Sequence, residues 1–538
     1  AKWGKPRQMR MLPFLLLASS ALSAQAFGVP PAATQRLGEA RIAPAFSQLP
    51  ASRLSTFPLA IATTPRASIP TKRRRHLDVF MSSGRGQDEL PVDVAVIGGG
   101  PAGLALSAAL GERGLRVLCC DPALDQDFVP NYGVWIDEIE AYGMTHLCKS
   151  VWPKASVFIG GGDGEKKLLD RPYGQIDTRK CKDWYLERCD KTGVKLSKVQ
   201  VGSIEHSHEG SSISFKGGGN CKAKVVVDCT GHAKAFTEYK DGKDPGFQAA
   251  YGIGAEIEEG TYPYPIDEML LMDFRDDHIR SGTPEEKESE ELPTFIYCMP
   301  RDSKYVFFEE TSLIANPPLK FEDLKRRLHT RLDAWGVKIK DVDEEEFCLI
   351  PMGGQFPVVP QRVIGFGGAS AIVHPATGYM FAATQRLATE TADAIQKALQ
   401  QHPEDPAKVS EAVWDTLWSE QRIRQRDFQQ FGGEYLEEIK LSELRDFFGS
   451  FFKLPYEQWT EFLSMGLVEP LERLVFGLGV WAGTSNRVRL SLSLKGMLSG
   501  PEGWIRLGRS VLPVADYDSK TLPTKENMPT FFSKEKTI

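Results

Sequence analysis

Val92-Asp93-Val94-Ala95-Val96-Ile97-Gly98-Gly99-Gly100-Pro101-Ala102-Gly103 decides the fold, because an apolar strand runs into a GxGxxG turn and then into a helix over 104–113. In such a turn Gly98 allows the tight bend, Gly100 lets the backbone approach a pyrophosphate, and Gly103 lets the helix pack against the strand. The N-terminus of the helix is then aimed at anionic phosphate. The stretch therefore predicts a dinucleotide cradle.

A second predicted strand supports the cradle. Leu115–Cys120 ends at Asp121, 23 residues after Gly98, where an acidic side chain can hold the hydroxyls of a ribose. A glycine-rich turn without a ligand is the alternative. The order of strand, glycines, helix, strand and acid favours the nucleotide site.

The charge is unevenly distributed along the 538 residues. Residues 1–87 hold 13 Lys and Arg against two acids, so this stretch carries +11 and the remainder −17. The length suggests two to four folded units. An acidic body argues against a nucleic acid as partner.

The basic N-terminal stretch has the features of a targeting segment. An apolar run over Met11–Leu22 follows Arg10 and leads through small residues to Phe27, which predicts a signal peptide over 1–27. The run is too short to span a bilayer. Residues 28–88, rich in Ala, Ser, Thr, Pro and Arg, predict a transit region and linker. Together they resemble the plastid address of algae with secondary plastids; a disordered tail with a chance apolar run is the alternative.

The cysteines and histidines do not indicate a metal site. The nine cysteines include no CxxC pair and no companion histidine spacing, so neither zinc nor a disulfide framework is expected. His206 and His208 lie in a polar stretch over Ser203–Ser212, which we interpret as a solvated loop. We therefore expect no metal.

The body divides into a nucleotide domain that is interrupted by a second lobe. Residues 89–250 alternate strand and helix signals, and an apolar run at Val225–Val227 leads into Asp228-Cys229-Thr230-Gly231. Strand-like runs without long helices between them then predict an antiparallel substrate lobe over 251–350. These runs are Tyr251–Ile257, Met269–Phe274, Thr294–Met299 and Tyr305–Thr311.

A second strand-to-glycine passage returns the chain to the nucleotide domain over 351–410. Val363–Phe366 enters Gly367-Gly368-Ala369, and the chain then reaches His374-Pro375-Ala376-Thr377-Gly378-Tyr379. We expect a helix to begin there and to direct the partial positive charge of its N-terminus at the cradle. The predicted fold class is α/β, with a Rossmann-like domain of the two-dinucleotide-domain flavoprotein type.

The C-terminal part is predicted to be helical. Residues 411–506 are rich in aromatic side chains, and 507–538 have the composition of a polar tail. No apolar run reaches the 18 to 20 residues, roughly, that are needed to cross a bilayer. Two interpretations stay open: the aromatic helices dock on a membrane surface, or they form a cap that packs as ordinary core.

Six motifs, in order and with compatible spacing, resemble the plant-type lycopene cyclases from about Val92 to about residue 505. They are Asn131-Tyr132-Gly133-Val134-Trp135, Arg171-Pro172-Tyr173-Gly174, Met272-Asp273-Phe274-Arg275-Asp276, Phe307-Phe308-Glu309-Glu310-Thr311, Pro351-Met352-Gly353-Gly354 and Val373-His374-Pro375-Ala376-Thr377-Gly378-Tyr379.

The resemblance implies a carotenoid cyclase that closes the acyclic ends of lycopene into ionone rings. It implies reduced FAD without net redox change, with NAD(P)H as the source of reduction, and a substrate taken from the plastid membrane. The stretch Met352–Arg362 resembles the β-ring enzymes, whereas Phe308 and Ala376-Thr377 resemble the ε-ring enzymes; the balance favours β-rings. Cofactor contacts are expected at Gly98, Gly100, Ala102, Gly103, Asp121, Arg179, Gly367, Gly368, Pro375 and Gly378.

The resemblance also names candidate catalytic residues. Alternation along the strand Tyr305–Thr311 puts Glu309 and Glu310 on opposite faces, so they cannot share one site. The essential acid of the family motif maps onto Glu309, and an acid in an apolar pocket keeps its proton, as a donor must. Glu310 is expected to pair structurally. His374 matches a family residue needed for activity, and either transfers a proton or orients the flavin loop.

Other activities on this fold are weighed against the cyclase. A flavin monooxygenase or an isoprenoid reductase is disfavoured, because those families carry Gly-Asp where this chain has Gly367-Gly368. A lycopene ε-cyclase, a paralogue that converts epoxy-carotenoids by the same cation chemistry, and a non-catalytic carotenoid-binding protein remain the alternatives.

Overall fold

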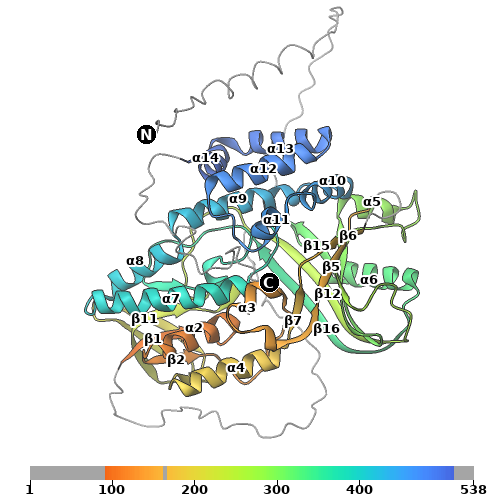
Figure 1. Ribbon diagram of the computed structural model, residues 1–538. Coiled ribbons are helices and arrows are strands. Elements are labelled where there is room, and N and C mark those ends of the chain that lie inside the picture. Colours follow the sequence, from red (N-terminus) through yellow and green to blue (C-terminus); the bar gives the residue numbers. More distant parts are fainter. Residues whose placement is uncertain (1–90, 161–165, 514–538) are drawn as a thin grey trace, which may run out of the picture. The chain divides into compact units, whose positions relative to one another are not determined.

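The computed structural model describes residues 91–160 and 166–513. The predicted signal peptide (1–27), the predicted transit region (28–88) and residues 514–538 of the predicted polar tail lie outside this part. The described residues form two large sheets and a small third sheet of β3 (Gly133–Trp135), β7 (Tyr173–Ile176) and β4 (Cys148–Trp152). Figure 1 shows helices against the large sheets and a group of C-terminal helices next to them.

The first sheet contains the predicted cradle. Strand β1 (Val92–Ile97) lies between two parallel neighbours, β2 (Val117–Cys120) and β11 (Asn220–Asp228). From Val94 to Ile97 the strand is a run of small and branched apolar residues, as expected where both faces of a parallel strand are covered. The other strands are β8 (Lys195–Ser197) beside β2, β17 (Val363–Gly365) beside β11, and the antiparallel hairpin of β9 (Val201–His206) and β10 (Ser211–Phe215).

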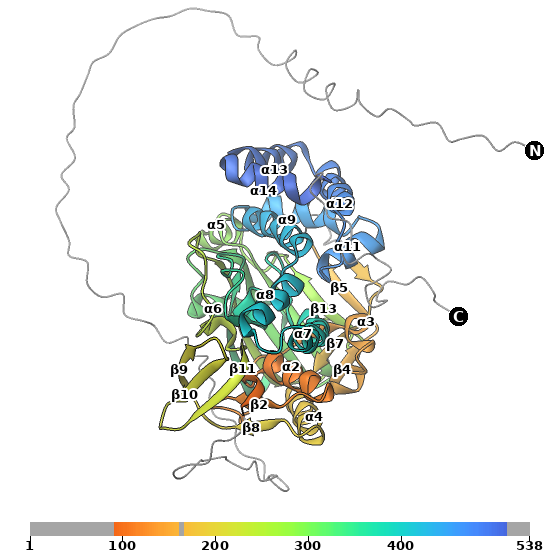
Figure 2. The same ribbon diagram turned by 90° about the vertical axis from the view of Figure 1, so that its left-hand side faces the viewer.

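Helices cover the first sheet (Figure 2). Helix α2 (Pro101–Glu112) is buried along most of its length between α4 (Thr178–Lys191) and α7 (Phe381–Gln401). The expected loop over Ser203–Ser212 is confirmed only in part: His206 ends β9 and its ring bonds the Ser211 hydroxyl at 2.8 Å, whereas the exposed His208 lies in the turn between β9 and β10. In the described residues, no cluster of side chains fits a metal ion, and all nine cysteines are free thiols.

The second sheet is not confined to residues 251–350 and is not wholly antiparallel. Strand β5 (Lys154–Phe158), from within the first lobe's sequence, pairs in parallel with β13 (Glu268–Asp273). The sequence of the short strand β5 does not by itself indicate which sheet it joins. The strand order is β16 (Ile339–Met352), β12 (Gly246–Ile257), β15 (Tyr305–Ala315), β14 (Thr294–Asp302), β13, β5 and β6 (Lys166–Leu169).

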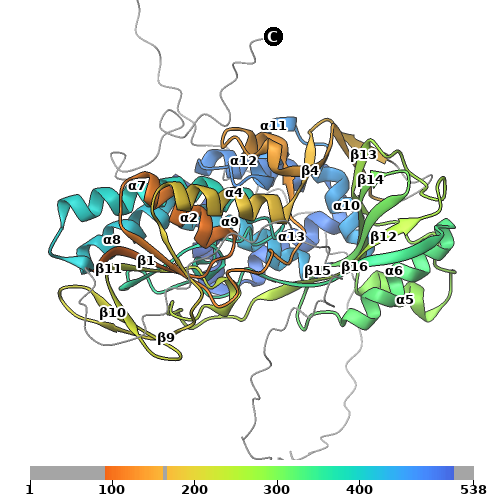
Figure 3. The ribbon, with the colours of Figure 1, turned by 90° about the horizontal axis from the view of Figure 1, so that it is seen from below.

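Both faces of the second sheet are covered, as Figure 3 shows from below. Helix α6 (Phe321–Trp335) buries Leu324, Leu328 and Leu332 against one face, as its three- and four-residue spacing predicts. The other face joins the buried cluster of the C-terminal helices. The small helix α5 (Pro284–Glu291) lies beside α10 (Leu441–Phe451).

The predicted helical region is present and extends further than expected. Helix α14 runs to Val511, so residues 507–511 belong to it and not to a tail. Among the residues described, none of the helices combines the length and the apolarity that crossing a bilayer requires. These helices are α8 (Pro406–Leu417), α9 (Glu420–Leu436), α10 (Leu441–Phe451), α11 (Tyr456–Leu463), α12 (Pro470–Gly483), α13 (Asn486–Leu498) and α14 (Gly500–Val511).

Candidate active site

Two glycines of the cradle have no room for a side chain. Gly98 has a φ of +113°, and a Cβ there would overlap the carbonyl oxygen of Cys229. A Cβ on Gly103 would overlap the carbonyl oxygen of Gly98. The turn and the close contact between helix and strand therefore need glycine at both positions.

Gly100 differs from its neighbours, because the space beside it is open. Its backbone is extended (φ −74°, ψ −175°), and a Cβ there would meet no atom within 4 Å. Gly100 is also the N-cap of α2, whose first N–H groups receive no side-chain cap. Unpaired N–H groups beside open space suit an anionic ligand, so the cradle fits the pyrophosphate of a dinucleotide.

Asp121 lies at the end of β2, as predicted, and faces the glycine turn. Its Oδ2 accepts from the Gly99 N–H at 2.7 Å, and its Oδ1 accepts from the Ala123 N–H at 2.6 Å. The carboxylate thus ties β2 to the cradle while its remaining lone pairs stay available to hydroxyl donors.

The second glycine passage lies against the first turn of α2. Gly367 has a φ of +65°, and a Cβ there would come within 2.7 Å of the Ala102 Cβ. The next residue, Gly368, contacts Gly231 of the turn that follows β11. Residues far apart in the sequence thus close the cradle, as the strand-to-glycine pattern predicts.

The helix expected at His374 begins seven residues later, at Phe381. A closed turn precedes it, in which the His374 N–H donates to the Tyr379 carbonyl at 2.9 Å and the Gly378 N–H donates to the His374 carbonyl at 2.9 Å. Gly378 has a φ of +73°, and a Cβ there would lie 3.1 Å from Gln248 Oε1 and 3.5 Å from Ile350 Cγ2. This left-handed residue breaks the helical path, and the turn lies against β12 and β16.

His374 is fully buried beneath this turn, and both of its ring nitrogens have partners. Nδ1 accepts from the Ala376 N–H at 3.2 Å, and Nε2 donates to the Phe462 carbonyl of α11 at 3.0 Å. Burial lowers the pKa of the ring to about 4. The imidazole is therefore neutral at physiological pH and joins the turn to α11.

Arg179 lies in the first turn of α4 and is exposed. Its Nη1 lies 3.2 Å from the Asp127 carboxylate, in the loop that follows β2. In the described residues, the polar contact of the Arg179 guanidinium is this surface ion pair, and the structure does not bring Arg179 to the cradle.

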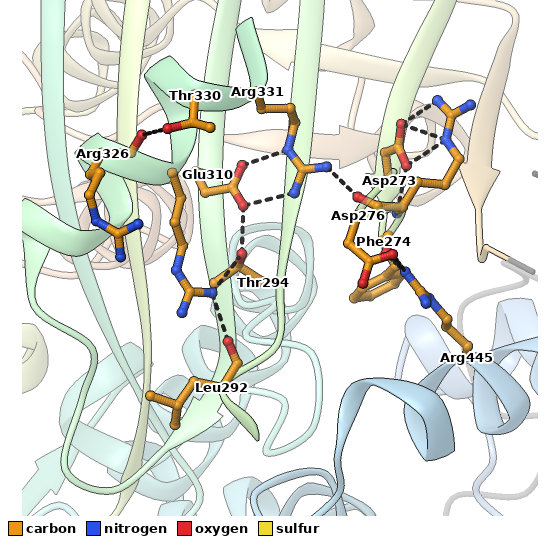
Figure 4. Close-up of polar contacts among 12 residues, drawn as sticks. Asp273, Phe274, Asp276, Leu292, Thr294, Glu310, Arg326, Thr330, Arg331 and Arg445 are labelled. Carbon is orange, nitrogen blue, oxygen red and sulfur yellow. Dashed lines mark hydrogen bonds and ion pairs between the residues drawn. The ribbon is translucent and has the colours of Figure 1, made fainter. Parts of the chain in front are cut away.

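Glu309 and Glu310 face opposite sides of β15, which confirms the alternation. Glu310 is fully buried under α6 and forms an ion pair with Arg331 at 3.0 Å, with the Thr294 hydroxyl donating to the same carboxylate at 2.6 Å (Figure 4). The predicted structural pairing of Glu310 is confirmed. Figure 4 also shows Arg445 of α10 bonded to Asp276, which fastens the C-terminal helices to the lobe.

Glu309 lies on the face that Phe307 and Leu313 share with the C-terminal helices. Its Oε1 accepts from the Thr311 hydroxyl at 2.8 Å. Burial raises the pKa of this carboxyl well above its ordinary value of 4.5. Glu309 therefore has the environment of an acid that keeps its proton near neutrality.

A second carboxyl, Glu346 of β16, lies on the same face and was not predicted; it is buried, whereas Glu309 is half-buried. Gly252 of β12 pairs with Glu309 on one side and with Glu346 on the other, so the three residues form one row across the sheet. Glu346 accepts from Asn131 Nδ2 at 2.8 Å. Burial, together with the charge of Glu309, raises the pKa of Glu346 above its ordinary range.

The row continues into a group of tyrosines. Tyr297 of β14 pairs with Glu309, and its hydroxyl lies 3.3 Å from the hydroxyl of Tyr173. Gly133 lies against both phenols, where a Cβ would overlap their oxygens. The motif Asn131–Trp135 thus supports the acid row through Asn131 and leaves space for the tyrosines at Gly133.

The fold and the cradle together define the class of the protein. It has the two-lobed architecture of FAD-dependent flavoproteins. The structure resembles a geranylgeranyl bacteriochlorophyll reductase-like protein from Thermoplasma acidophilum with a TM-score of 0.56 and 12% identity, over 75% of this chain and 99% of that one. It also resembles the halogenase PltM, solved with phloroglucinol and FAD, with a TM-score of 0.50 and 13% identity, over 78% and 98%. At this identity the likeness concerns the fold alone.

Comparison of sequences identifies the family. The family model described as lycopene cyclase protein matches residues 93–490, and the chain belongs to this family. It is 39% identical over 429 residues to the chloroplastic lycopene beta cyclase of Solanum lycopersicum, over 80% of this chain and 85% of the relative. It is also 39% identical over 445 residues to the chromoplastic capsanthin/capsorubin synthase of Citrus sinensis, over 82% and 86%.

Proposed function

We propose that the protein is a lycopene β-cyclase that binds FAD and converts the acyclic ends of lycopene into β-ionone rings. The observation that carries this proposal is the position of Glu309. Its carboxyl lies on the buried sheet face against which the Gly378 turn also packs, and its pKa is raised by burial. The row of Gly252 is four residues along β12 from Gln248, which corresponds to about 13 Å in a strand. A proton donor and the flavin segment thus share one face.

Ring closure needs acid–base chemistry and no net oxidation. A proton adds to one alkene carbon, the resulting tertiary cation closes the ring, and a neighbouring carbon loses a proton. Glu309 is proposed to supply the first proton from its O–H. Reduced FAD, held by Gly98, Gly100, Ala102, Gly103, Asp121, Gly367, Gly368, Pro375 and Gly378, would supply negative charge beside the cation.

The aromatic residues around the row are proposed to protect the cation. Phe307 and the phenol of Tyr297 lie beside Glu309. Their faces can attract a cation by about 0.5 to 2 kcal/mol each. Burial raises the pKa of Tyr297 and Tyr173 well above the ordinary value of 10.0, so both stay neutral and do not trap the cation as phenolates.

Expression in lycopene-accumulating bacteria tests the function. We expect β-carotene to replace lycopene. δ-Carotene would identify an ε-cyclase, and unchanged lycopene would contradict the proposal. Purified enzyme under anaerobic reducing conditions, with NAD(P)H as the proposed reductant, should still form product, which excludes an oxygenase; a gain of two hydrogens in mass would indicate a reductase.

The second candidate is a paralogue that acts on epoxy-carotenoids by the same cation chemistry. It is supported by the two relatives named capsanthin/capsorubin synthase, which at 39% and 38% identity are as similar as the cyclases. Incubation with an epoxy-carotenoid in parallel with lycopene separates the two, because the preferred substrate will be consumed at the higher kcat/KM.

His374 is proposed to orient the flavin turn and not to transfer a proton. Both ring nitrogens are occupied by backbone partners, and the ring is neutral. We expect His374→Gln to lower flavin content but to keep the rate per bound flavin within about tenfold of wild type, because loss of a true acid or base costs about 10²- to 10⁴-fold. A fall of that larger size would assign the proton transfer to His374.

The same substitution has a pH-dependent effect on stability. The pKa of folded His374, about 4, lies below the ordinary value of 6.5, so the unfolded chain takes up the proton first as the pH falls. This contribution to the free energy of unfolding is complete above pH 6.5 and is lost between pH 6.5 and about 4. When the pH is lowered from 7 to 5, we expect the free energy of unfolding, measured with urea, to fall less in His374→Gln than in wild type. His208→Gln, at an exposed histidine, is the control and should follow wild type.

The outer C-terminal helices are proposed to dock on the surface of a plastid membrane, which holds the hydrocarbon substrate. Of the eighteen large apolar side chains that are exposed among the described residues, eleven lie within 471–512. Only Val488 is buried in α13. The inner helices behave differently: Phe451, Phe462 and Phe476 are buried in the core. We therefore propose that the inner aromatic side chains form ordinary core, whereas the exposed apolar side chains of the outer helices contact the membrane.

The docking proposal predicts a specific loss of vesicle binding. The triple variant Leu490→Ser, Leu498→Ser and Ile505→Ser removes side chains that are 60%, 80% and 60% exposed. Burial of each is worth about 1.5 to 3 kcal/mol when complete, so we expect flotation with phosphatidylcholine–phosphatidylglycerol vesicles to weaken about a hundredfold or more.

The matched control is Val151→Ser, Ile266→Ser and Val342→Ser, at residues that are exposed by 45% to 49% outside the C-terminal helices. This control should float like wild type. Equal binding by both triple variants would contradict the docking surface.

The plastid location and the remaining contacts complete the proposal. The names of the plant relatives are chloroplastic or chromoplastic, which supports a plastid protein. The proposal that the protein comes from an alga with a secondary plastid rests on residues 1–88 alone. Arg179 is retained as a candidate for the flavin phosphates, to which its exposed guanidinium could turn from Asp127.

A further inference from the structure

Glu346 shares the acid chemistry of Glu309. We infer that Glu309 and Glu346 form a carboxyl pair that holds one proton between them, so that one member protonates the substrate and the other accepts the proton that leaves. This inference rests on the proposed cyclase function and adds a second catalytic residue to it.

The register of the sheet brings the two carboxyls together. Both glutamates pair with Gly252, and side chains of directly paired residues project from the same face. The Cα atoms of Glu309 and Glu346 lie two strand spacings apart, roughly 10 Å. Two glutamate side chains that extend toward each other can span most of this distance. Gly252 adds no side chain between the two glutamates, and the Phe307 ring lies where a Cβ of Gly252 would be.

The surroundings of Glu346 are those of a reactive carboxyl and not of a structural one. Glu346 is 4% exposed, and the partners of its carboxyl in the described residues are the N–H and the side-chain amide of Asn131. Glu310, on the opposite face of β15, is also buried but is neutralised by Arg331. Burying a carboxylate without a cation is costly, so the absence of one at Glu346 indicates a group that carries a proton part of the time.

Asn131 is oriented so that it supports this role. Its side-chain oxygen accepts from Gln175 at 2.9 Å and from Lys149 at 3.3 Å, so its amide nitrogen faces the acids. That nitrogen donates to Glu346 and to Glu344. An amide donor stabilises a carboxylate without removing its ability to take up a proton.

The pair balances the reaction. The O–H bond of the protonated member breaks as a C–H bond forms on the alkene, which leaves two carboxylates. The cation then loses a proton from a neighbouring carbon, and that proton returns to a carboxylate, so the pair ends with the one proton with which it began. Two like charges at close range cannot both persist easily, which favours the return of the proton.

The groups that face the pair are few and do not include a direct cation partner in the described residues. Raised pKa values of both carboxyls agree with one retained proton. The titratable and charged neighbours are Glu344 and Cys348 on β16, Tyr297 on β14, and Tyr132 and Lys149 around Asn131.

The test compares Glu346→Gln with Glu344→Gln in the purified holoenzyme. Glu344 is the matched control, because it lies on the same strand and also accepts from Asn131, at 2.9 Å. We expect Glu346→Gln to lower kcat by about a hundredfold or more, with wild-type flavin content and melting temperature, while Glu344→Gln stays within about threefold of wild type. Glu346→Asp should recover part of the rate.

The pH profile and a titration without substrate complete the test. One shared proton predicts a bell-shaped profile of kcat, because full protonation removes the base and full deprotonation removes the acid. In Glu346→Gln the infrared carboxyl band of Glu309 should titrate at lower pH than in wild type, since the like charge is gone. An unshifted band, or a full rate in Glu346→Gln, would overturn the pair. The band is measured without lycopene, so it tests the pair even where wild-type enzyme forms no ring.

Discussion

Replacing Glu309 with Gln is expected to lower the rate of ring formation by about 10²- to 10⁴-fold, the usual worth of a general acid. The amide keeps the shape of the side chain and can still bond Thr311, but it has no proton of suitable acidity to donate. Flavin content and thermal stability should stay at the wild-type level, because Glu309 forms no ion pair in the described residues. Pigment analysis in lycopene-accumulating bacteria, together with flavin absorbance, measures both effects.

The neighbouring residue provides the control with the opposite signature. Glu310→Gln leaves Arg331 without its buried partner, and breaking such a pair costs about 3 to 5 kcal/mol of stability. This variant should unfold at lower denaturant concentration, while the folded fraction keeps its rate. If Glu309→Gln forms rings at the wild-type rate, the proton donor is another group.

Gly100→Val is expected to abolish flavin binding without unfolding the protein. The extended backbone of Gly100 tolerates a β-branched residue, and a Cβ there meets no protein atom within 4 Å. The new side chain would occupy the open space beside the α2 N-terminus, where the pyrophosphate is proposed to bind. We expect flavin content to fall below about a tenth of wild type, which corresponds to about 1.4 kcal/mol or more of lost affinity.

Gly449→Val is the control for adding the same side chain at an open site. Gly449 lies in α10, far along the chain from the cradle, and also has no atom within 4 Å of a Cβ. It should keep its flavin. Urea unfolding of the apo forms measures stability, and a Gly100→Val protein that purifies with full flavin would exclude the cradle as the binding site.

The cradle was predictable because its determinants are local. The glycines, the helix and Asp121 lie within 30 residues, and steric limits at Gly98 and Gly103 allow few other conformations. The opposite faces of Glu309 and Glu310 follow from strand periodicity, and the pairing of Glu310 with Arg331 agrees with that prediction. These features depend on residues that are neighbours in sequence.

The parts that were not predictable depend on pairing at long range. Glu346 lies in an acidic run, Glu344-Glu345-Glu346, which has the composition of a solvated edge. Only the register of β16 against β12 shows that Glu346 faces inward beside Gly252. Strand alternation puts Glu346 on the face opposite to Phe347 and Leu349, and this pattern is the one sequence signal that could have indicated its orientation. The delayed start of α7 depends on contacts of Gly378 with the second sheet, which no local pattern contains.

The interleaving of the two lobes constrains how this chain can be rearranged. Residues 154–169 leave the first lobe to add β5 and β6 to the edge of the second sheet, and the chain then returns to build β8 to β11. In a chimera that takes only residues 251–350 from a relative, the relative's β13 would have to pair with the β5 of this chain. Grafting the substrate lobe between enzymes therefore requires two segments to be transferred together, and neither lobe can be excised as an autonomous module.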